Sequence, residues 1–360
     1  MQSYTGHISK RIPLQDLLPL EMPIGLCLEP VNLCNFKCTC CPVSLLDYKS
    51  VVKDVGMMDL DLYKKILGDI KVMGKLKKLN LYGDGEPLLH KNIPDMVRLA
   101  IQEDVAFPIS ITSNASLLTE ELAVRLIESG LHYFRASVYS VREKRHAEIT
   151  RSSTSVTDIF NNIKRFVEIR DKLKSKTPYI YVKMIDTYSR ENDDFLKLYS
   201  PIADEANIET PMNWNSYDNI DLISKVDPNQ KTDQTLIQGF YNQRGASGYK
   251  RICTTAFHSL NIKHNGDVVI CIVDWNKGTK VGNIKEQSLS EIWFGEELRQ
   301  FRSMHVENRR SENISCRNCK YLYNNPDNID HLPQDQLYEI INHKMNTEWC
   351  HSTKAGEHEH

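Results

Sequence analysis

Three cysteines near the start of the chain, Cys34, Cys38 and Cys41, stand in the spacing C-x3-C-x2-C. Three thiolates this close together can bind three of the four irons of a cubane [4Fe–4S] cluster. The fourth iron then has no protein ligand, and an open position on a redox cofactor is where a reactant can bind. A structural zinc site is one alternative, although zinc usually takes four protein ligands. Disulfides are the other, although they are rare in a reducing compartment.

The triplet resembles the motif of the radical S-adenosylmethionine (SAM) superfamily. The resemblance implies that the amine and carboxylate of SAM bind the open iron. It also implies that an electron from the cluster splits the sulfonium and releases a 5′-deoxyadenosyl radical. Cys40 departs from the family pattern, which has an aromatic residue at that position. We expect Cys40 to be a small buried cover rather than a ligand.

A second set of cysteines lies downstream, in the order Cys253-x17-Cys271 and Cys316-x2-Cys319. Asn265-Gly266 separates two alternating runs before Cys271, which is a hairpin signal. This arrangement resembles the SPASM domain, which carries auxiliary iron–sulfur clusters. Four cysteines make one complete ligand set, the shortened "twitch" form found in the 2-deoxy-scyllo-inosamine dehydrogenase type. Zinc is again the alternative.

Two cysteines remain outside these sets, Cys27 and Cys350. We expect Cys350 to be a free thiol, although a late cysteine can be a ligand in full SPASM domains.

The composition is that of an ordinary soluble globular protein, with 41% hydrophobic and 26% charged residues. A net charge of −2 gives no general reason to expect a nucleic acid or an anionic membrane as partner. The first residues lack a signal-peptide pattern, and no run of 18 apolar residues occurs. Ten cysteines without an export signal indicate metal ligands in a reducing compartment, so we expect a cytoplasmic protein.

Between residues 24 and 215, short alternating runs take turns with longer runs of helical period. The predicted strands are Ile24–Glu29, Lys77–Tyr82, Ala106–Thr112, Tyr133–Val138, Tyr179–Asp186 and Asn207–Asn213. The predicted helices are Asp59–Val72, Ile93–Gln102, Thr119–Glu128, Thr157–Lys172 and Asp193–Tyr199. This order predicts an α/β fold with a parallel sheet. Six such units resemble the partial (β/α)6 barrel of radical SAM enzymes, with the cysteine triplet at the carboxyl end of the first strand.

The chain is expected to have four parts. They are an N-terminal arm at residues 1–21, the barrel at 22–225, the SPASM/twitch-like domain at 226–330, and a C-terminal helix and tail at 331–360. The last helix is predicted over Asp335–Lys344.

The predicted strands each have one polar face. In Tyr133–Val138 the apolar residues alternate with Tyr133, Arg135 and Ser137. The apolar face must pack against the helices, so the polar face should line the lumen and contact a polar ligand. Candidate catalytic residues near the lumen mouth are Arg135, Lys183, Tyr181, Asp186 and His90.

Several residues resemble the SAM-binding positions of the family. Gly83-Asp84-Gly85-Glu86-Pro87 resembles the Gly-Gly-Glu-Pro motif, with Asp84 where the pattern has glycine. Glycines let backbone groups approach the SAM amine, and a carboxylate suits its positive charge. The cofactor-binding set implied by the resemblance is Gly83, Gly85, Glu86, Asn114, Ser137 and Arg151. A solvated loop arginine is the alternative for Arg151.

Two clusters imply an electron path. The radical would remove a hydrogen atom from the substrate, and the resulting carbon radical would pass an electron to the auxiliary cluster, leaving a ketone. We therefore predict a radical SAM oxidoreductase that acts on a sugar, sugar nucleotide or aminocyclitol, with a flavodoxin or ferredoxin as electron donor. The alternatives are a peptide-modifying SPASM enzyme, a redox-neutral carbohydrate epimerase, and an activating factor for a partner enzyme.

Overall fold

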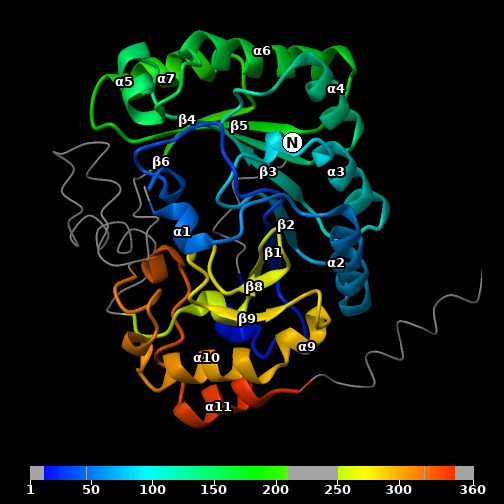
Figure 1. Ribbon diagram of the computed structural model, residues 1–360, viewed down its shortest axis with the longest axis vertical. Helices are drawn as coiled ribbons and strands as arrows, with labels where there is room; N and C mark the ends of the chain where they lie inside the picture. Colours follow the sequence, from blue (N-terminus) through cyan, green and yellow to red (C-terminus); the bar gives the residue numbers. More distant parts are fainter. Residues whose placement is uncertain (1–11, 46, 210–249, 320, 345–360) are drawn as a thin grey trace, which may run out of the picture.

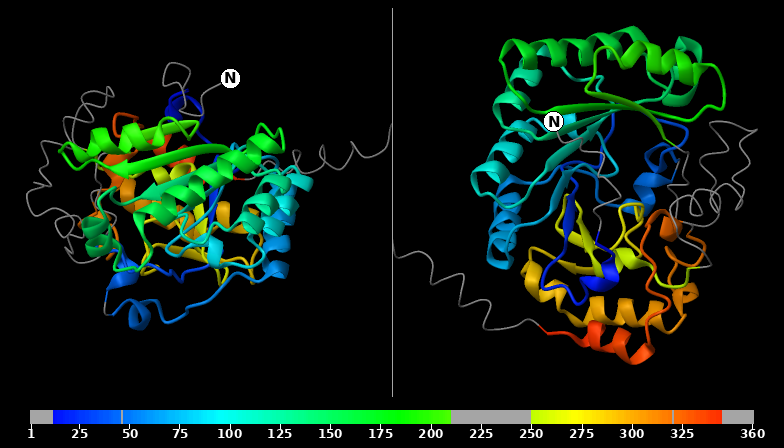
Figure 2. Two further views of the ribbon diagram at one scale, coloured as in Figure 1. Left: turned by 90° about the horizontal axis from the view of Figure 1, so that it is seen from above. Right: turned by 180° about the vertical axis from the view of Figure 1, so that it is seen from behind.

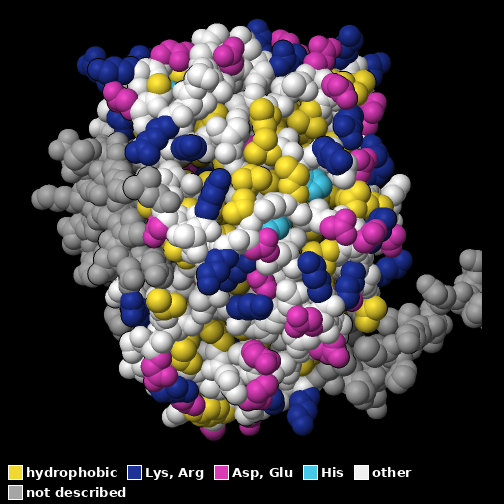
Figure 3. Space-filling model, in the orientation of Figure 1, with side chains coloured by type: hydrophobic (Ala, Val, Ile, Leu, Met, Phe, Trp, Pro, Cys, Tyr) yellow, Lys and Arg dark blue, Asp and Glu magenta, His cyan; other side chains and the backbone are white. Residues whose placement is uncertain are grey.

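A computed structural model describes residues 12–45, 47–209, 250–319 and 321–344 (Figure 1). One sheet of nine strands passes through both halves of the molecule, in the order β6-β5-β4-β3-β2-β1-β7-β8-β9. Figure 2 shows that helices cover its outer side in the upper part of the molecule. No helix in these residues is long and apolar enough to cross a membrane. Charged side chains of both signs are interspersed over the face shown in Figure 3.

The first six strands are parallel and alternate with helices, as predicted. The strands are β1 (Gly25–Leu28), β2 (Lys78–Leu81), β3 (Ile109–Ser113), β4 (Tyr133–Val138), β5 (Tyr179–Ile185) and β6 (Glu205–Glu209). The main helices are α2 (Leu60–Met73), α3 (Ile93–Gln102), α4 (Glu120–Glu128), α6 (Val156–Lys172) and α7 (Glu191–Tyr199). Two short helices were not predicted, α1 (Tyr48–Val52) and α5 (Glu143–Thr150). The last four residues of the predicted strand Asn207–Asn213 lie outside the described residues.

The helix α6 shows why these elements form and pack. Ser155 and Asp158 make a capping box at its start, which satisfies amides that the helix itself cannot bond. Its buried residues Ile163 and Phe166 are three apart and so share one face. The rings of Phe166 and Phe134 of β4 lie 5.0 Å apart between centroids. Burial of each such side chain stabilises the fold by roughly 1.5–3 kcal/mol.

The strand register confirms that polar residues share one face of the barrel sheet. Arg135 pairs with Tyr181, and Ser137 pairs with Lys183. The intervening residues of β4 and β5, such as Phe134 and Val182, are fully buried in the core shared with the helices. The polar side chains therefore line the lumen.

The C-terminal region continues the same sheet. β7 (Ser259–Ile262) lies parallel to β1, and β8 (Asp267–Val269) and β9 (Lys280–Asn283) follow antiparallel. Gly266 has a φ of +92° in the turn between β7 and β8, which confirms the predicted hairpin. Helices α9 (Leu289–Trp293), α10 (Glu296–Val306) and α11 (Gln334–Asn342) complete this part. The predicted boundary at residue 225 lies outside the described residues.

Candidate active site

The cysteine triplet lies in a loop that follows β1. Cys38 is buried, and Cys34 and Cys41 are half-buried. The Cys41 amide donates to the Cys38 carbonyl at 3.0 Å, and the Lys37 amide donates to the carbonyl of Thr150 at 2.9 Å, so the loop is anchored to the end of α5. Burial raises the pKa of Cys38, and the neighbouring Cys40 and Cys41 thiols raise it further. The three thiols therefore lie close together, as ligands of one cluster must.

Aromatic side chains enclose this loop. Phe36 is 1% exposed, and its ring centroid lies 6.5 Å from that of Tyr139, which follows β4. The Tyr139 hydroxyl hydrogen-bonds to Cys38 and lowers the pKa of that thiol, against the larger effect of burial. Tyr139 thus provides an aromatic neighbour to the triplet where Cys40 replaces the family's aromatic residue. Cys40 is buried, as expected, and its exclusion from the ligand set stays a prediction.

The glycines of the loop after β2 allow a close approach to the segment that leads to Cys34. A Cβ atom on Gly85 would lie 2.4 Å from the carbonyl oxygens of Val31 and Leu33, so only glycine fits. The Glu86 amide donates to the Leu33 carbonyl at 2.8 Å. The glycine loop is therefore fixed directly beside the cysteine loop.

Glu86 is 3% exposed, and its carboxylate joins the ends of β2 and β3. It accepts hydrogen bonds from the Leu88 amide at 3.0 Å, the Ser113 hydroxyl at 2.7 Å and the Asn114 amide at 2.8 Å. Burial raises its pKa. The Asn114 side-chain nitrogen lies 4.0 Å from the sulfur of Cys34. The structure therefore brings Glu86 and Asn114 together beside the triplet, with the carboxylate holding the loops in place.

The remaining predicted SAM-binding residues occupy different environments. Gly83 allows a close approach to Glu29, whose Cγ would lie 2.6 Å from an added Cβ. Ser137 is half-buried near the end of β4. Arg151 is exposed and has a left-handed φ of 49° just after α5, next to the residue that anchors the cysteine loop.

Three of the predicted catalytic residues meet at one carboxylate in the lumen. Glu209, at the end of β6, accepts a hydrogen bond from Arg135, from the ammonium of Lys183 at 2.9 Å and from the hydroxyl of Tyr181 at 3.1 Å. Lys183 also lies close enough to Cys40 to lower the pKa of that buried thiol. Sequence reasoning missed Glu209, although the alternation of Glu205, Asn207 and Glu209 along β6 could have revealed it.

The side chains of the other two candidates bond to other groups, although the Asp186 amide donates to the main-chain carbonyl of Glu209 at 2.8 Å. The Asp186 carboxylate accepts from the Tyr188 amide and the Asn192 side chain, both at 2.7 Å. His90 is buried, with Nε2 2.9 Å from the Met58 carbonyl and Nδ1 3.3 Å from the amide of Asn92. Because main-chain groups occupy both ring nitrogens, the structure gives His90 a structural environment.

A buried charged group beneath the glycine loop was not predicted. The Lys263 ammonium lies 2.8 Å from Asp84 and 3.2 Å from Glu29, and His264 Nδ1 lies 3.3 Å from the other oxygen of Glu29. The side chains of Lys263 and Glu29 are 4% and 3% exposed. Burial acts to raise the pKa of both carboxyls, and Lys263 acts to lower both. The result is a pKa well below the usual range for Glu29 and a raised pKa for Asp84.

The four downstream cysteines, Cys253, Cys271, Cys316 and Cys319, line one cavity in the C-terminal region. Burial raises the pKa of Cys316, and the neighbouring Cys253 and Cys319 raise it further. Arg310 donates to the Cys319 carbonyl at 3.0 Å and so ties this loop down.

The imidazole of His305 lines the same cavity and is 1% exposed. Its Nε2 has no hydrogen-bond partner among the described residues. A buried polar atom without a hydrogen-bond partner lowers the stability of a protein by about 1–3 kcal/mol. The cavity therefore suits a bound group that offers His305 Nε2 a hydrogen-bond partner. Burial lowers the pKa of His305 to about 4, which keeps the ring neutral at neutral pH.

No three His, Cys, Asp or Glu side chains in the described ranges converge closely enough for a single metal ion. The thiolates of a cubane cluster stand farther apart than zinc ligands, because each binds a different iron. In each set the thiols lie close enough to raise one another's pKa, as shown for Cys38 and Cys316. Both cysteine sets therefore fit iron–sulfur clusters.

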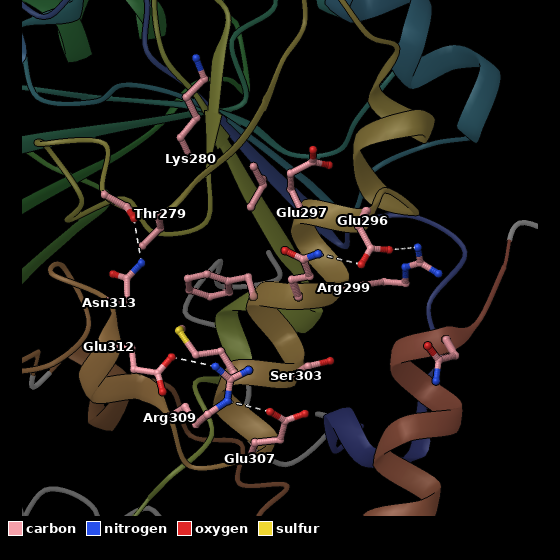
Figure 4. A pocket seen from close by; sticks show the side chains of 16 residues that line it. Thr279, Lys280, Glu296, Glu297, Arg299, Ser303, Glu307, Arg309, Glu312 and Asn313 are labelled. Atoms are coloured by element: carbon pink, nitrogen blue, oxygen red, sulfur yellow. Dashed lines mark hydrogen bonds and ion pairs between the residues drawn. The ribbon is translucent and has the colours of Figure 1, made fainter.

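A separate open groove of about 700 Å³ lies along α10 (Figure 4). Its two arginines pair with glutamates of the same groove: Arg309 binds Glu307 and Glu312, and Arg299 binds Glu296. It lies on the outside of the C-terminal region and shares only Thr279 and Phe301 with the four-cysteine cavity.

Comparison with known families defines the class of protein. The model of the radical SAM superfamily matches residues 28–191, and the model of the SPASM iron–sulfur cluster-binding domain matches residues 253–320. Residues 28–191 are therefore a radical SAM domain and residues 253–320 a SPASM domain, and the chain is a radical SAM enzyme. The two domain matches confirm the predicted cofactors. The radical SAM domain binds a [4Fe–4S] cluster and SAM, and the SPASM domain binds auxiliary iron–sulfur clusters. The assignment of individual cysteines stays a prediction.

Two curated relatives cover most of the chain. A tungsten-containing aldehyde ferredoxin oxidoreductase cofactor-modifying protein of Pyrococcus furiosus is 27% identical over 305 residues, covering 76% of this chain and 82% of the relative. The SAM-dependent 2-deoxy-scyllo-inosamine dehydrogenase of Niallia circulans is 23% identical over 286 residues, covering 79% of this chain and 88% of the relative.

Solved structures show the same fold. BtrN in complex with AdoMet and 2-DOIA is 19% identical, with a TM-score of 0.51 over 86% of this chain and 98% of that one. Streptococcus suis SuiB bound to the precursor peptide SuiA is 16% identical, with a TM-score of 0.58 over 79% of this chain and 67% of that one. The predicted partial barrel with a SPASM domain is confirmed.

Proposed function

We propose that the chain is a radical SAM oxidoreductase that converts an alcohol group of a sugar, sugar nucleotide or aminocyclitol to a ketone. The observation that carries this proposal is the polar lumen, in which Arg135, Lys183 and Tyr181 meet at Glu209 beside the cysteine loop. A polar lumen suits a hydrophilic small substrate. The relatedness to a dehydrogenase of an aminocyclitol supports the same class of reaction.

In this proposal Cys34, Cys38 and Cys41 bind the first cluster, and the four cysteines around the His305 cavity bind the auxiliary cluster. When bound, the first cluster and SAM supply a 5′-deoxyadenosyl radical, and the auxiliary cluster accepts one electron. Glu86 and Asn114 hold the glycine loop against the cysteine loop. They act as positioning residues for the SAM site.

The oxidation removes two electrons and two protons from the alcohol. One hydrogen atom leaves the carbinol carbon and completes the methyl group of 5′-deoxyadenosine. The hydroxyl proton goes to a carboxylate oxygen of Glu209, and the remaining electron goes to the auxiliary cluster. Lys183 and Arg135 lower the pKa of Glu209 against the effect of burial, so this carboxylate is ionised at neutral pH. Cleavage of SAM would also take one electron, which we propose that a reduced flavodoxin or ferredoxin donates to the first cluster. The electron taken up by the auxiliary cluster would leave to an oxidised carrier of the same class, so that one electron enters and one leaves in each turnover.

The test is the formation of 5′-deoxyadenosine by the anaerobically reconstituted, dithionite-reduced enzyme. Pools of sugars, nucleotide sugars and aminocyclitols are compared with a pool of peptides. A rise of about tenfold with a carbohydrate pool, together with a product two mass units lighter than its substrate, supports the proposal. A response to peptides alone contradicts it and identifies a peptide-modifying enzyme. A carbohydrate product of unchanged mass identifies an epimerase.

A further inference from the structure

We propose that His305 Nε2 donates a hydrogen bond to a sulfur of the auxiliary cluster and thereby raises the reduction potential of that cluster. The inference rests on one part of the proposed function, the auxiliary cluster bound by the four cysteines of the C-terminal cavity. It adds a residue that adjusts this cluster for taking up an electron. His305 acts through the cluster, so it is a positioning residue and not a catalytic one.

The helix α10 holds the His305 ring in the wall of the cavity. Leu298, Phe301 and His305 follow one another at intervals of three and four residues and share the buried face of this helix. The ring centroids of Phe301 and His305 lie 5.0 Å apart, and both residues line the cavity together with the four cysteines. His305 is 1% exposed, so its ring is open to the cavity rather than to bulk water.

The two ring nitrogens of His305 have different surroundings. Nδ1 accepts a hydrogen bond from the Cys253 amide, with 3.4 Å between the two nitrogens. Because Nδ1 is the acceptor in this bond, the ring proton lies on Nε2. The Arg251 carbonyl acts to raise the pKa of the ring, against the larger effect of burial, but it is not a hydrogen-bond partner of Nε2. This N–H is buried, and no group in the described part of the chain accepts it.

The charged side chains of the cavity wall already have partners in the protein. The Asp274 carboxylate accepts hydrogen bonds from the amide and the hydroxyl of Thr279, at 2.7 and 2.6 Å. Arg310 donates to the Cys319 carbonyl at 3.0 Å. Among the described residues of this wall, His305 Nε2 is the buried side-chain nitrogen that is left without an acceptor. The group that binds in the cavity must therefore supply one.

An iron–sulfur cluster offers acceptors of the right kind. Hydrogen bonds to the sulfurs of a cluster are among the factors that set its reduction potential. Reduction adds negative charge to these sulfurs, so a donor stabilises the reduced cluster more than the oxidised one. The structure already aims one main-chain donor at a cysteine sulfur, since the Tyr321 amide lies 3.3 Å from that of Cys319. His305 Nε2 adds a side-chain donor to the same cavity.

The rest of the wall strengthens the effect. Ile270 and Leu322 line the cavity and are 1% and 2% exposed. In apolar surroundings of this kind a hydrogen bond is electrostatically stronger than in water. The direction of the effect suits the proposed reaction, because a higher potential favours transfer of an electron from the carbon-centred radical of the substrate to the auxiliary cluster.

The test is the midpoint potential of the auxiliary cluster in the anaerobically reconstituted holoenzyme, measured by a redox titration followed by electron paramagnetic resonance. His305→Asn keeps an acceptor for the Cys253 amide and removes the donor at Nε2. We expect this variant to disfavour the reduced cluster about tenfold, a fall of about 59 mV for a one-electron couple. His305→Gln places an amide N–H where Nε2 lies, so its potential should stay close to that of the wild type. Leu322→Met, a volume-conserving change in the same wall, is the matched control and should leave the potential unchanged.

A second measurement keeps the native His305 and so does not depend on the folding of a His305 variant. Enzyme with isotope-labelled histidine is examined by pulsed electron paramagnetic resonance of its reduced auxiliary cluster. His305 is the histidine among the described residues of the cavity wall, so a coupling to a histidine nitrogen identifies it. We expect a weak coupling, as transmitted through a hydrogen bond. Absence of the coupling, or the strong coupling of a direct iron ligand, overturns the inference.

The potentials separate a hydrogen bond to the cluster from a structural role. Loss of thermal stability in both His305 variants, with a fall in potential confined to His305→Asn, supports the inference, because a structural role would not follow the donor. Equal shifts in the two variants, or no shift in either, overturn it.

Failure of the proposed function gives a different result. If the wild-type enzyme shows no auxiliary-cluster signal after reconstitution, the assignment of the four cysteines fails, and this inference fails with it. If the signal is present and its potential does not depend on the donor at position 305, the inference alone is wrong.

Discussion

Replacement of Lys263 by methionine should destabilise the protein by about 3–5 kcal/mol, the cost of breaking a buried ion pair by removing one partner. Lys263 is the shared cation of Asp84 and Glu29, at 2.8 and 3.2 Å. Methionine fills a similar volume, so the loss is chiefly electrostatic. In a chain of 360 residues, with an unfolding entropy of about 2.1 cal/mol/K per residue, the cost corresponds to a fall in melting temperature of roughly 4–7 °C.

The effect should depend on pH with a definite sign. Lys263 lowers the pKa of both carboxyls, so its removal raises both. A carboxyl whose pKa is raised in the folded state destabilises folding as pH rises towards that pKa. The cost of Lys263→Met should therefore be larger at pH 8 than at pH 5.5. The additional change Asp84→Asn should recover part of the lost stability, because one of the two unpaired charges is gone.

The assay is thermal unfolding of the anaerobic holoenzyme at a fixed heating rate, at both pH values. Lys64→Met is the control, because Lys64 forms an exposed pair with Asp61 and should shift the melting temperature by no more than about 1–2 °C. A Lys263→Met melting temperature within the range of the control at pH 8 would refute the reasoning. So would a larger loss at pH 5.5 than at pH 8.

Three further predictions concern the cofactor sites. Cys40→Ala should keep the iron content of the reconstituted enzyme, whereas Cys38→Ala should lose about four irons. Of these two cysteines, only Cys38 is assigned as a cluster ligand. Equal iron losses in the two variants would show that Cys40 is also a ligand. Cys271→Ala should remove the auxiliary cluster's electron paramagnetic resonance signal and leave that of the first cluster, while Cys350→Ala should leave both. Glu86→Gln should weaken SAM binding about tenfold and destabilise the fold by about 1–3 kcal/mol. The reason is that the NH2 group of glutamine would face hydrogen-bond donors of Leu88, Ser113 and Asn114. A variant that binds SAM with wild-type affinity in calorimetry would contradict this prediction.

The alternation of strands and helices was predictable because it is a local property of the sequence. β4 follows the predicted range residue for residue, since its apolar and polar residues alternate strictly from Tyr133 to Val138. α1 and α5 were missed because α1 has only five residues and α5, from Glu143 to Thr150, is mostly polar. Their positions depend on tertiary contacts rather than on periodicity: the end of α5 bonds to the cysteine loop, and Tyr48 and Val52 of α1 pack on Trp275.

The candidate site was predictable where a motif carries it and unpredictable where distant strands meet. The two cysteine sets were predicted from their spacing together with the resemblance to radical SAM and SPASM sequences. Glu209 and Lys263 did not stand out, because neither lies in a motif and each gains its role from a side chain far away in sequence. Asp84 looked like a departure from a glycine pattern, and the structure supplies its reason, a lysine about 180 residues later.

The pairing of β7 with β1 makes the C-terminal region part of the barrel. Leu260 lies beside Leu26 in this parallel pair, and Lys263 follows β7 directly, opposite Glu29. Residues 1–249 alone would expose the edge of β1 and leave two buried carboxylates without their cation. We expect such a fragment to aggregate or to lose the cluster absorbance on reconstitution, while the full chain expressed in parallel keeps it. A monomeric fragment that binds SAM with the affinity of the full chain would show that the barrel is independent. It would then contradict the view that one continuous sheet couples the SAM site to the auxiliary cysteines.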